Sequence, residues 1–208
     1  MNNEIKDLIK EIKDIMRKEN EFPYWFYLNK MELIMKALQE EPYGKAEIGV
    51  HIQGKLSIGR NSVIKAGTRI EGNVFIGDDC IIGPNAFLRG NVILEGNNHV
   101  SNSEIKNSII LNNSNVPHYS YVGDSIIGQN CNLGAGTKIA NLRFDETTIK
   151  VSVKGQVIDT KLRKLGCLIH DNVRTGVNSG INCGVIIYPG MAVNPNYFTK
   201  DHVKVFKF

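Results

Sequence analysis

The chain has 208 residues, of which 25 are basic and 21 are acidic, so its formal net charge is +4. This balance is mild and no run of like charge resembles a nucleic-acid-binding arm, so we expect small anionic molecules rather than nucleic acid as partners. The amino terminus has no apolar signal-peptide core, and no stretch of about 18 apolar residues occurs. The sequence therefore predicts a cytoplasmic protein without a membrane span.

Two amphipathic helices are predicted within residues 1–44. In Asn3–Lys18, apolar side chains recur every three or four residues, and this stripe must pack against the neighbouring helix, the body of the protein or a partner subunit. A second helix is expected over about Leu28–Gln39, because Pro42 and Gly44 follow it. The aromatic segment between them holds Trp25, and we interpret it as a plug where the helices meet the body.

From Ala46 onward the apolar period changes to six. An α-helix of 3.6 residues per turn would rotate such positions away from one another, whereas short strands separated by turns keep them aligned. Three hexads that close one triangular coil make a parallel β-helix. Asn61, Asn97 and Asn130 fall at the corners, where asparagine tolerates left-handed backbone. The first unbroken series of hexads is Ile52, Ile58, Ile64, Ile70, Ile76, Ile82, Leu88, Leu94 and Val100.

The hexads then shift phase and continue to about residue 197, with one interruption at 142–166. Summed, they predict about seven coils over residues 45–197, followed by a tail at 198–208. The interruption alternates apolar and polar residues on either side of Lys154-Gly155, which predicts a hairpin that projects from the β-helix. Insertions in a solenoid often lie at the binding face. The predicted fold is an all-β solenoid preceded by two helices.

The segment 116–144 contains four polar residues that the repeat does not need: His118, Tyr121, Asn132 and Asn141. Aliphatic, small and glycine residues alone can specify the core of such a repeat, so these side chains are candidates for chemistry. Histidine is suited to accept a proton at neutral pH. Carboxamides both donate and accept hydrogen bonds, which suits sugar hydroxyls and an amine. We therefore interpret this stretch as an active site.

Three segments of the chain resemble a known family: Val-Pro-His-Tyr-Ser-Tyr-Val-Gly-Asp-Ser-Ile-Ile-Gly, Asn-Leu-Gly-Ala-Gly-Thr and Ala-Asn-Leu-Arg-Phe-Asp. They resemble the carboxy-terminal acetyltransferase half of the bifunctional sugar-1-phosphate nucleotidyltransferase/acetyltransferases. The likeness covers about Phe22–Tyr197. It implies a left-handed β-helix that forms a homotrimer and binds acetyl-coenzyme A and an amino sugar between subunits. Nothing like the nucleotidyltransferase domain precedes the hexads, so we expect a stand-alone acetyltransferase half.

The resemblance also implies roles for individual residues. His118 matches the general base and Tyr121 a residue near the sugar, while Asn132 and Asn141 match substrate-binding asparagines. We group His118, Tyr121 and Asn141 as the catalytic set and Asn132 with the substrate-binding residues. In the turn Gly134-Ala135-Gly136, Ala135 matches the position where the backbone meets the acetyl thioester, and glycines there permit close approach.

Three cations complete the expected site. Arg89 and Lys106 match the pair that holds the sugar phosphate, and the planar fork of arginine and the point charge of lysine suit that anion. Lys150 resembles a lysine of the archaeal branch. We expect the hairpin to support the coenzyme or the sugar phosphate through Lys150 or its basic neighbours Lys161, Arg163 and Lys164. No metal is expected.

Two other functions are associated with an architecture of this kind. A γ-class carbonic anhydrase shares the architecture but needs three histidines on zinc, two of them separated by four residues, and the sequence has no such spacing. A non-catalytic trimeric scaffold, left after loss of the nucleotidyltransferase half, is the principal alternative. The sequence also leaves the acceptor open between glucosamine 1-phosphate, galactosamine 1-phosphate and a nucleotide-linked amino sugar.

Overall fold

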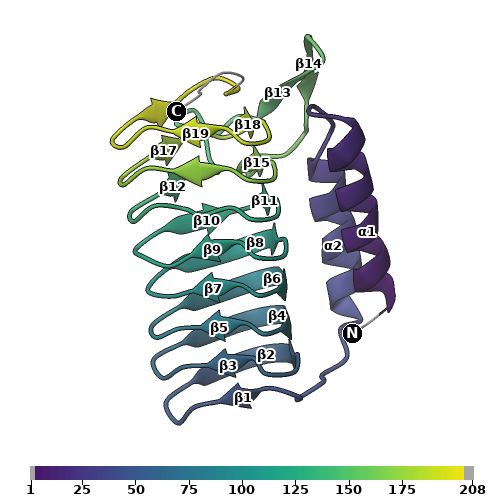
Figure 1. Cartoon of the computed structure of the whole chain (residues 1–208). Helices are drawn as coiled ribbons and strands as arrows, with labels where there is room; N and C mark the ends of the chain where they lie inside the picture. Colours follow the sequence, from purple (N-terminus) through teal and green to yellow (C-terminus); the bar gives the residue numbers. More distant parts are fainter. Residues whose placement is uncertain (1–2, 204–208) are drawn as a thin grey trace.

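A computed structural model describes residues 3–203 as a parallel β-helix with two helices packed along one side (Figure 1). Val63 pairs with Lys45 and Ile81 pairs with Val63, so one coil in this region takes 18 residues, or three hexads. The predicted solenoid with two preceding helices is confirmed. The elements follow in groups that share a face of the β-helix.

The first face carries β1 (Lys45–Ala46), β3 (Val63–Ile64), β5 (Ile81–Ile82), β7 (His99–Val100), β9 (Asn115–Val116), β16 (Arg174–Thr175) and β19 (Ala192–Val193). Four longer strands run from the second face onto the third: β2 (His51–Ile58), β4 (Arg69–Asp78), β6 (Phe87–Gly96) and β8 (Glu104–Ile110). The second face continues with β10 (Tyr121–Gly123), β12 (Lys138–Ile139), β17 (Gly180–Ile181) and β20 (Phe198–Thr199). The third continues with β11 (Ile126–Ile127), β15 (Leu168–Ile169) and β18 (Ile186–Ile187).

The β-helix is slightly longer than the hexads indicated. The third face begins with a bridge between Pro42 and Ile58 and ends with one between Ile187 and Val203. On the second face, β20 extends the ladder beyond residue 197. The coils therefore exceed the expected number of about seven, because the outermost ones are built from residues outside the hexad series. Residues 204–208, the end of the expected tail, lie outside the described part of the chain.

The hexad residues fill the interior of the β-helix. Ile64, Ile70, Ile76 and Ile82 are all completely buried, and each fully buried aliphatic side chain contributes about 1.5–3 kcal/mol. The chain turns between faces through left-handed residues: the φ angles of Asn61, Asn97 and Asn130 are +59°, +50° and +56°. Asparagine is one of the few residues other than glycine that adopts this conformation readily. The period of six therefore places the core, and the corner residues close each coil.

Helices α1 (Asn3–Lys18) and α2 (Trp25–Lys36) cover the third face. The apolar stripe of α1 is buried, as the prediction required. The second helix begins three residues earlier than predicted, at Trp25, because the Phe26 N–H bonds the Pro23 carbonyl (3.0 Å) and starts the first turn within the aromatic segment. The outward side chains of the third face beneath the helices are apolar: Phe75, Ile93, Ile109, Ile126, Leu168 and Ile186.

The junction between the helices is tied to the β-helix where the hairpin leaves it. The Tyr24 hydroxyl donates to the Gly166 carbonyl (2.9 Å), and Nε2 of the buried His170 bonds the Asn20 carbonyl (2.8 Å). Strands β13 (Lys150–Val153) and β14 (Gln156–Asp159) form the antiparallel hairpin, which turns at Lys154 and Gly155 with φ of +51° and +79°. The helices and the hairpin therefore share one anchoring region.

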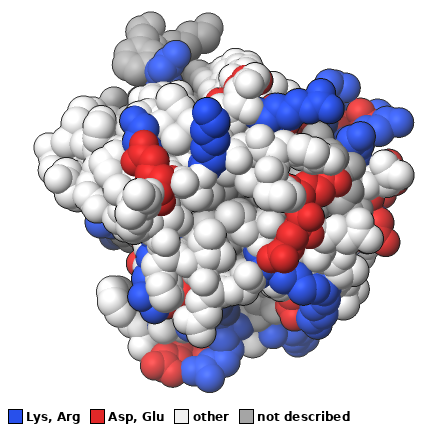
Figure 2. All heavy atoms as spheres, turned by 90° about the horizontal axis from the view of Figure 1, so that it is seen from below, with Lys and Arg blue, Asp and Glu red and all other residues white. Residues whose placement is uncertain are grey.

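Neither described helix is long and apolar enough to cross a membrane. Figure 2 shows the molecule from below, and on that face Lys and Arg side chains alternate with Asp and Glu side chains rather than forming a patch of one sign.

Candidate active site

Most of the predicted site residues are arranged around the second face, whose two edges are corners of the β-helix. His118 lies at the corner between the first and second faces and is exposed to solvent. The turn Gly134-Ala135-Gly136 occupies the same corner on the next coil, because the Gly136 N–H donates to the His118 carbonyl oxygen (2.9 Å). The structure therefore brings the expected base and the expected thioester-binding turn together.

The backbone amides of this turn are not equivalent. The Gly134 N–H donates to the carbonyl and the hydroxyl of Thr175 (3.0 and 2.9 Å), and the Gly136 N–H donates to His118. The Ala135 carbonyl accepts from the Asn178 N–H (2.8 Å), but within residues 3–203 the Ala135 N–H has no hydrogen-bond acceptor. Ala135 is only partly buried. Its N–H is thus the amide of this turn that is available to an oxyanion.

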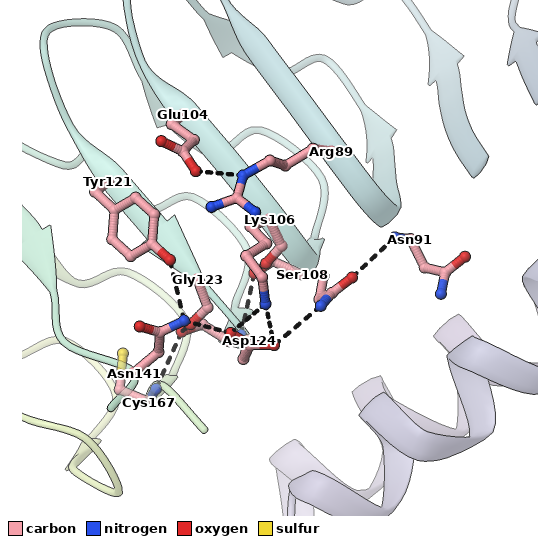
Figure 3. A network of polar contacts seen from close by, with 12 residues as sticks. Arg89, Asn91, Glu104, Lys106, Ser108, Tyr121, Gly123, Asp124, Asn141 and Cys167 are labelled. Carbon is pink, nitrogen blue, oxygen red and sulfur yellow. Dashed lines mark hydrogen bonds and ion pairs between the residues drawn. The ribbon is translucent and has the colours of Figure 1, made fainter. Parts of the chain in front are cut away.

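A hydrogen-bonded cluster occupies the opposite edge of the second face (Figure 3). Nδ2 of Asn141 lies 3.0 Å from the Tyr121 hydroxyl oxygen and 2.5 Å from Oδ2 of Asp124. The Lys106 ammonium donates to both Asp124 oxygens (2.8 and 2.9 Å), and Asn107 Nδ2 donates to Oδ1 (3.1 Å). Tyr121, Asn141 and Lys106 were predicted site residues, and Asp124 connects all three.

The ring of Tyr121 reaches this cluster because residue 123 has no side chain. A Cβ atom on Gly123 would lie 2.5 Å from the Tyr121 hydroxyl oxygen and 2.9 Å from Asn141 Nδ2. Both atoms would have to move if any other residue stood there. The glycine is therefore required here for space, and its place in the Val-Gly-Asp segment sets the geometry of the cluster.

Tyr121 remains a protonated phenol in this setting. Partial burial raises its pKa above the usual value, and the nearby carboxylates of Asp124 and Glu104 raise it further. The hydroxyl accepts from Asn141, so its own proton is available to an acceptor outside the cluster. Tyr121 is thus equipped as a hydrogen-bond donor rather than as a base.

Both cations of the predicted phosphate pair already have carboxylate partners. Arg89 and Lys106 stand side by side on neighbouring coils. Nε of Arg89 lies 2.6 Å from Oε1 of Glu104, and both side chains are more than a quarter exposed. The Lys106–Asp124 pair is only 11% and 12% exposed. A substrate phosphate would therefore compete with Glu104 at an open position and with Asp124 at a closed one.

Two predicted residues lie apart from this face. Asn132 is on the first face, in the ladder between Asn115 and Arg174, so one chain does not bring it to Tyr121 and Asn141. Lys150 begins the hairpin and lines a cavity of about 490 Å³ between the hairpin and the last coils, together with Arg143, Cys183, Lys200 and His202. Lys161 and Arg163 pair locally with Asp159 and Glu146.

Asp124 and Gly123 were not predicted as site residues. The same Gly-Asp pair occurs at Gly77-Asp78, where, among residues 3–203, the Asp78 carboxylate accepts a hydrogen bond only from the Arg60 N–H (2.8 Å). The distinguishing signal is Lys106 on the neighbouring coil, paired in register with Gly123. That register was hidden by the phase shift of the repeat. Within residues 3–203, no three His, Cys, Asp or Glu side chains are grouped so that they could hold a metal ion.

The sequence of this chain is similar to those of known proteins. No family model matches the chain. The bifunctional sugar-1-phosphate nucleotidylyltransferase/acetyltransferase of Sulfurisphaera tokodaii is 50% identical over 169 residues, which are 78% of this chain and 42% of that protein. The bifunctional protein GlmU of Methanocaldococcus jannaschii is 39% identical over 198 residues, which are 92% of this chain and 47% of that protein.

Among solved structures, a hexapeptide transferase family protein from Anaplasma phagocytophilum matches with a TM-score of 0.43 and 11% identity, covering 79% of this chain and 78% of that one. The chain spans less than half the length of the two curated relatives. Within that span, it is a homologue of the bifunctional sugar-1-phosphate nucleotidylyltransferase/acetyltransferases, as its sequence motifs predicted.

Proposed function

We propose that this chain transfers an acetyl group from acetyl-coenzyme A to the amine of an amino-sugar phosphate, with His118 as the general base. The observation that carries the proposal is the corner where the exposed His118 lies next to the Gly134–Gly136 turn, whose Ala135 N–H has no acceptor within residues 3–203. Homology to proteins named as acetyltransferases supports the same reaction class. A base and an oxyanion donor are the two elements that acyl transfer to an amine requires.

The reaction follows from the positions of these groups. The substrate ammonium first loses one proton to water, and the neutral amine nitrogen then attacks the thioester carbonyl carbon. The His118 imidazole accepts the second proton that this nitrogen must lose. The Ala135 N–H donates to the oxyanion that forms, and collapse of the adduct breaks the C–S bond. The thiolate of coenzyme A leaves and takes the proton from the imidazolium. Loss of such a base costs roughly 10²- to 10⁴-fold in rate.

The amino sugar is proposed to bind along the second face between His118 and Asn141. Asn141 and Tyr121 offer hydrogen bonds to its amine and hydroxyl groups. Arg89 is the more accessible of the two cations for the phosphate, because its partner Glu104 is partly solvated. Arg143 is paired with Asp145, but Lys150 and Lys200 against the single carboxylate of Asp201 leave the cavity beside the hairpin with a positive charge that suits a phosphate of the coenzyme or of the sugar.

We propose that a second and a third copy complete the site. Asn132 lies on a different face from Tyr121 and Asn141, so it joins them only if copies pack against one another. Tyr119, Phe144 and Val177 are exposed apolar residues that such packing would cover; Phe144 is fully exposed. Light scattering is expected to give the mass of a trimer. A monomer at micromolar concentration would count against a site shared between subunits.

The decisive experiment is turnover of a panel of acceptors: glucosamine 1-phosphate, galactosamine 1-phosphate and nucleotide-linked amino sugars. Each is incubated with acetyl-coenzyme A, and release of the free thiol is followed. The proposal expects rapid thiol release with at least one amino sugar and none with its N-acetylated form. Absence of release with every member, from a folded protein, would favour the non-catalytic scaffold.

A further inference from the structure

We propose that Asp124 is a positioning residue that orients Asn141 and Tyr121 toward the acceptor, so that the site presents one fixed hydrogen-bond acceptor and one fixed donor. The inference deepens the proposed function and rests on it. Asp124 lies at the corner opposite His118 and connects to three predicted site residues, Lys106, Asn141 and, through Asn141, Tyr121 (Figure 3).

The chemistry of the carboxylate fixes the orientation of Asn141. An ionised carboxylate can only accept hydrogen bonds, so the group of Asn141 that lies 2.5 Å from Oδ2 of Asp124 must be its amide nitrogen. The same nitrogen lies 3.0 Å from the Tyr121 hydroxyl oxygen, and its two hydrogens serve these two contacts. The amide oxygen of Asn141 is then left for the substrate. Without Asp124, the amide would be free to rotate and present either end.

The fixed orientation of the Asn141 amide also fixes the orientation of the Tyr121 hydroxyl group. Because the Tyr121 oxygen accepts from Asn141, its proton points away from the cluster. The site therefore offers an amide oxygen, which suits an ammonium or hydroxyl donor, beside a phenol proton, which suits a phosphate or hydroxyl oxygen. An acceptor molecule that carries an amine and an oxyanion close together matches both. Asp124 thus sets the specificity of the site without touching the substrate.

Asp124 is itself held firmly. Its side chain accepts from Lys106 and Asn107, and the residue is 8% exposed. Its backbone is fixed on both sides: its N–H donates to the Lys106 carbonyl (2.8 Å), and its carbonyl accepts from the Gly166 N–H (2.8 Å). Gly166 is the residue at which the chain rejoins the β-helix after the hairpin. Such a restrained carboxylate can orient its neighbours because it does not reorganise with them.

The test is Asp124→Asn, compared with Asp79→Asn. Both aspartates stand at corners with left-handed backbone, φ +50° and +58°, which asparagine also adopts. Asp79 accepts only from another corner residue, Asn61 (3.1 Å), so its variant controls for the corner itself. Asp124→Asn is expected to raise the KM for the amino sugar at least about tenfold, the size expected for loss of a hydrogen bond to a charged group. The KM for acetyl-coenzyme A should stay within about twofold.

A second pair of variants covers the case in which Asp124→Asn leaves Lys106 buried without its partner and the protein does not fold. Lys106→Gln and the double variant Lys106→Gln/Asp124→Asn are then compared, since no unpaired ammonium exists in either. The double variant should again have a KM for the amino sugar at least about tenfold above that of Lys106→Gln. Circular dichroism and thermal unfolding verify that both are folded.

The outcomes separate this inference from the function on which it rests. A wild-type chain that acetylates no member of the acceptor panel would overturn both. A wild type that turns over, with a KM in Asp124→Asn equal to that in Asp79→Asn, would overturn only the role of Asp124. A rise in the KM of both substrates together with a lower thermal midpoint, repeated in the Lys106→Gln background, would make Asp124 merely structural and would also overturn it.

Discussion

The second and third faces of the β-helix share one core but have different outer surfaces. Inward residues such as Ile76 on the third face and Ile70 on the second are completely buried in the same apolar interior. Outward residues on the third face are apolar, and α1 and α2 cover them. Outward residues on the second face include Arg69, Glu104, Tyr121 and Lys138, and these are partly or fully exposed.

The difference shows that the inward residues of the repeat specify the shape of the β-helix, while the outward residues determine whether a face is covered by helices or stays open to solvent. Apolar outward residues on successive rungs demand a cover, and the chain supplies it with its own first helices. A polar outward residue needs no cover, so the second face stays open between His118 at one edge and Asp124 at the other. Changes on the two faces should therefore affect different properties.

The largest effect on stability is expected from Ile93→Asp on the third face. Ile93 is completely buried beneath the helices, and an unpaired carboxylate there should destabilise the protein by roughly 3–5 kcal/mol. Tyr121→Phe on the second face keeps the ring and removes one hydroxyl bonded to Asn141, so its cost should be about 1 kcal/mol or less. Urea unfolding of both variants measures the contrast. Equal losses of unfolding free energy in the two variants would contradict the view that the third face supports stability and the second face does not.

Gly123→Ala should affect activity more than stability. The added methyl group would push the Tyr121 hydroxyl and the Asn141 amide aside, and neither group is backbone, so the fold can adapt. Misplacement of about 1 Å near a reacting group can cost up to about 10²-fold. Steady-state kinetics should show a KM for the amino sugar raised by about tenfold or more, with thermal unfolding nearly unchanged. A fully active variant would exclude the Tyr121–Asn141 contact from substrate binding.

A smaller effect is expected from Lys150→Ala in the hairpin. Lys150 lines the cavity beside Arg143. Removal of a substrate-binding cation should raise the KM of one substrate several-fold, which corresponds to about 1 kcal/mol of binding free energy, and should leave kcat nearly unchanged. Lys161→Ala is the matched control, because that lysine on the same hairpin pairs with Asp159. Equal kinetics for the two variants and the wild type would remove Lys150 from the site.

The smallest effect concerns pH and the third-face anchor at His170. Burial lowers the pKa of His170, so between that lowered value and about 6.5 the unfolded chain binds more protons than the folded one. This contribution to stability is complete above about pH 6.5 and is lost as the pH falls through that window. The thermal midpoint should therefore be lower below this window than above it. His170→Gln, which can still donate to the Asn20 carbonyl, should lose part of this pH dependence.

The fold was predictable because its cause is repeated along the chain. Each hexad places one aliphatic residue inside, and residues such as Asn61 and Asn97 lie at the corners. Many positions therefore indicate the same β-helix independently. The start of α2 was less predictable, since the contact of Phe26 with Pro23 extends it into the aromatic segment. The apolar pattern indicates which elements form, but the hydrogen bonds of their first turns, which that pattern does not show, set their ends.

The arrangement of the candidate site was predictable only in part. His118, Tyr121 and Asn141 stood out because the repeat has no use for them. Asp124 did not, because the same Gly-Asp pair also occurs at Gly77-Asp78, where the Asp78 carboxylate bonds the Arg60 N–H rather than a buried lysine. What distinguishes Asp124 is the buried Lys106 on the adjacent coil, and that neighbour depends on a register that the sequence does not display.

The central claim is that the open second face, beginning at His118, carries out acetyl transfer. The measurement that tests it most directly is kcat against pH for the wild type and for His118→Ala, with the acceptor that the panel identifies. The wild-type rate should rise with pH through one ionisation, because only neutral imidazole accepts the proton. His118→Ala should fold normally, lose roughly 10²- to 10⁴-fold in kcat and lack that ionisation. A His118→Ala chain with wild-type kcat and an unchanged pH profile would contradict the account.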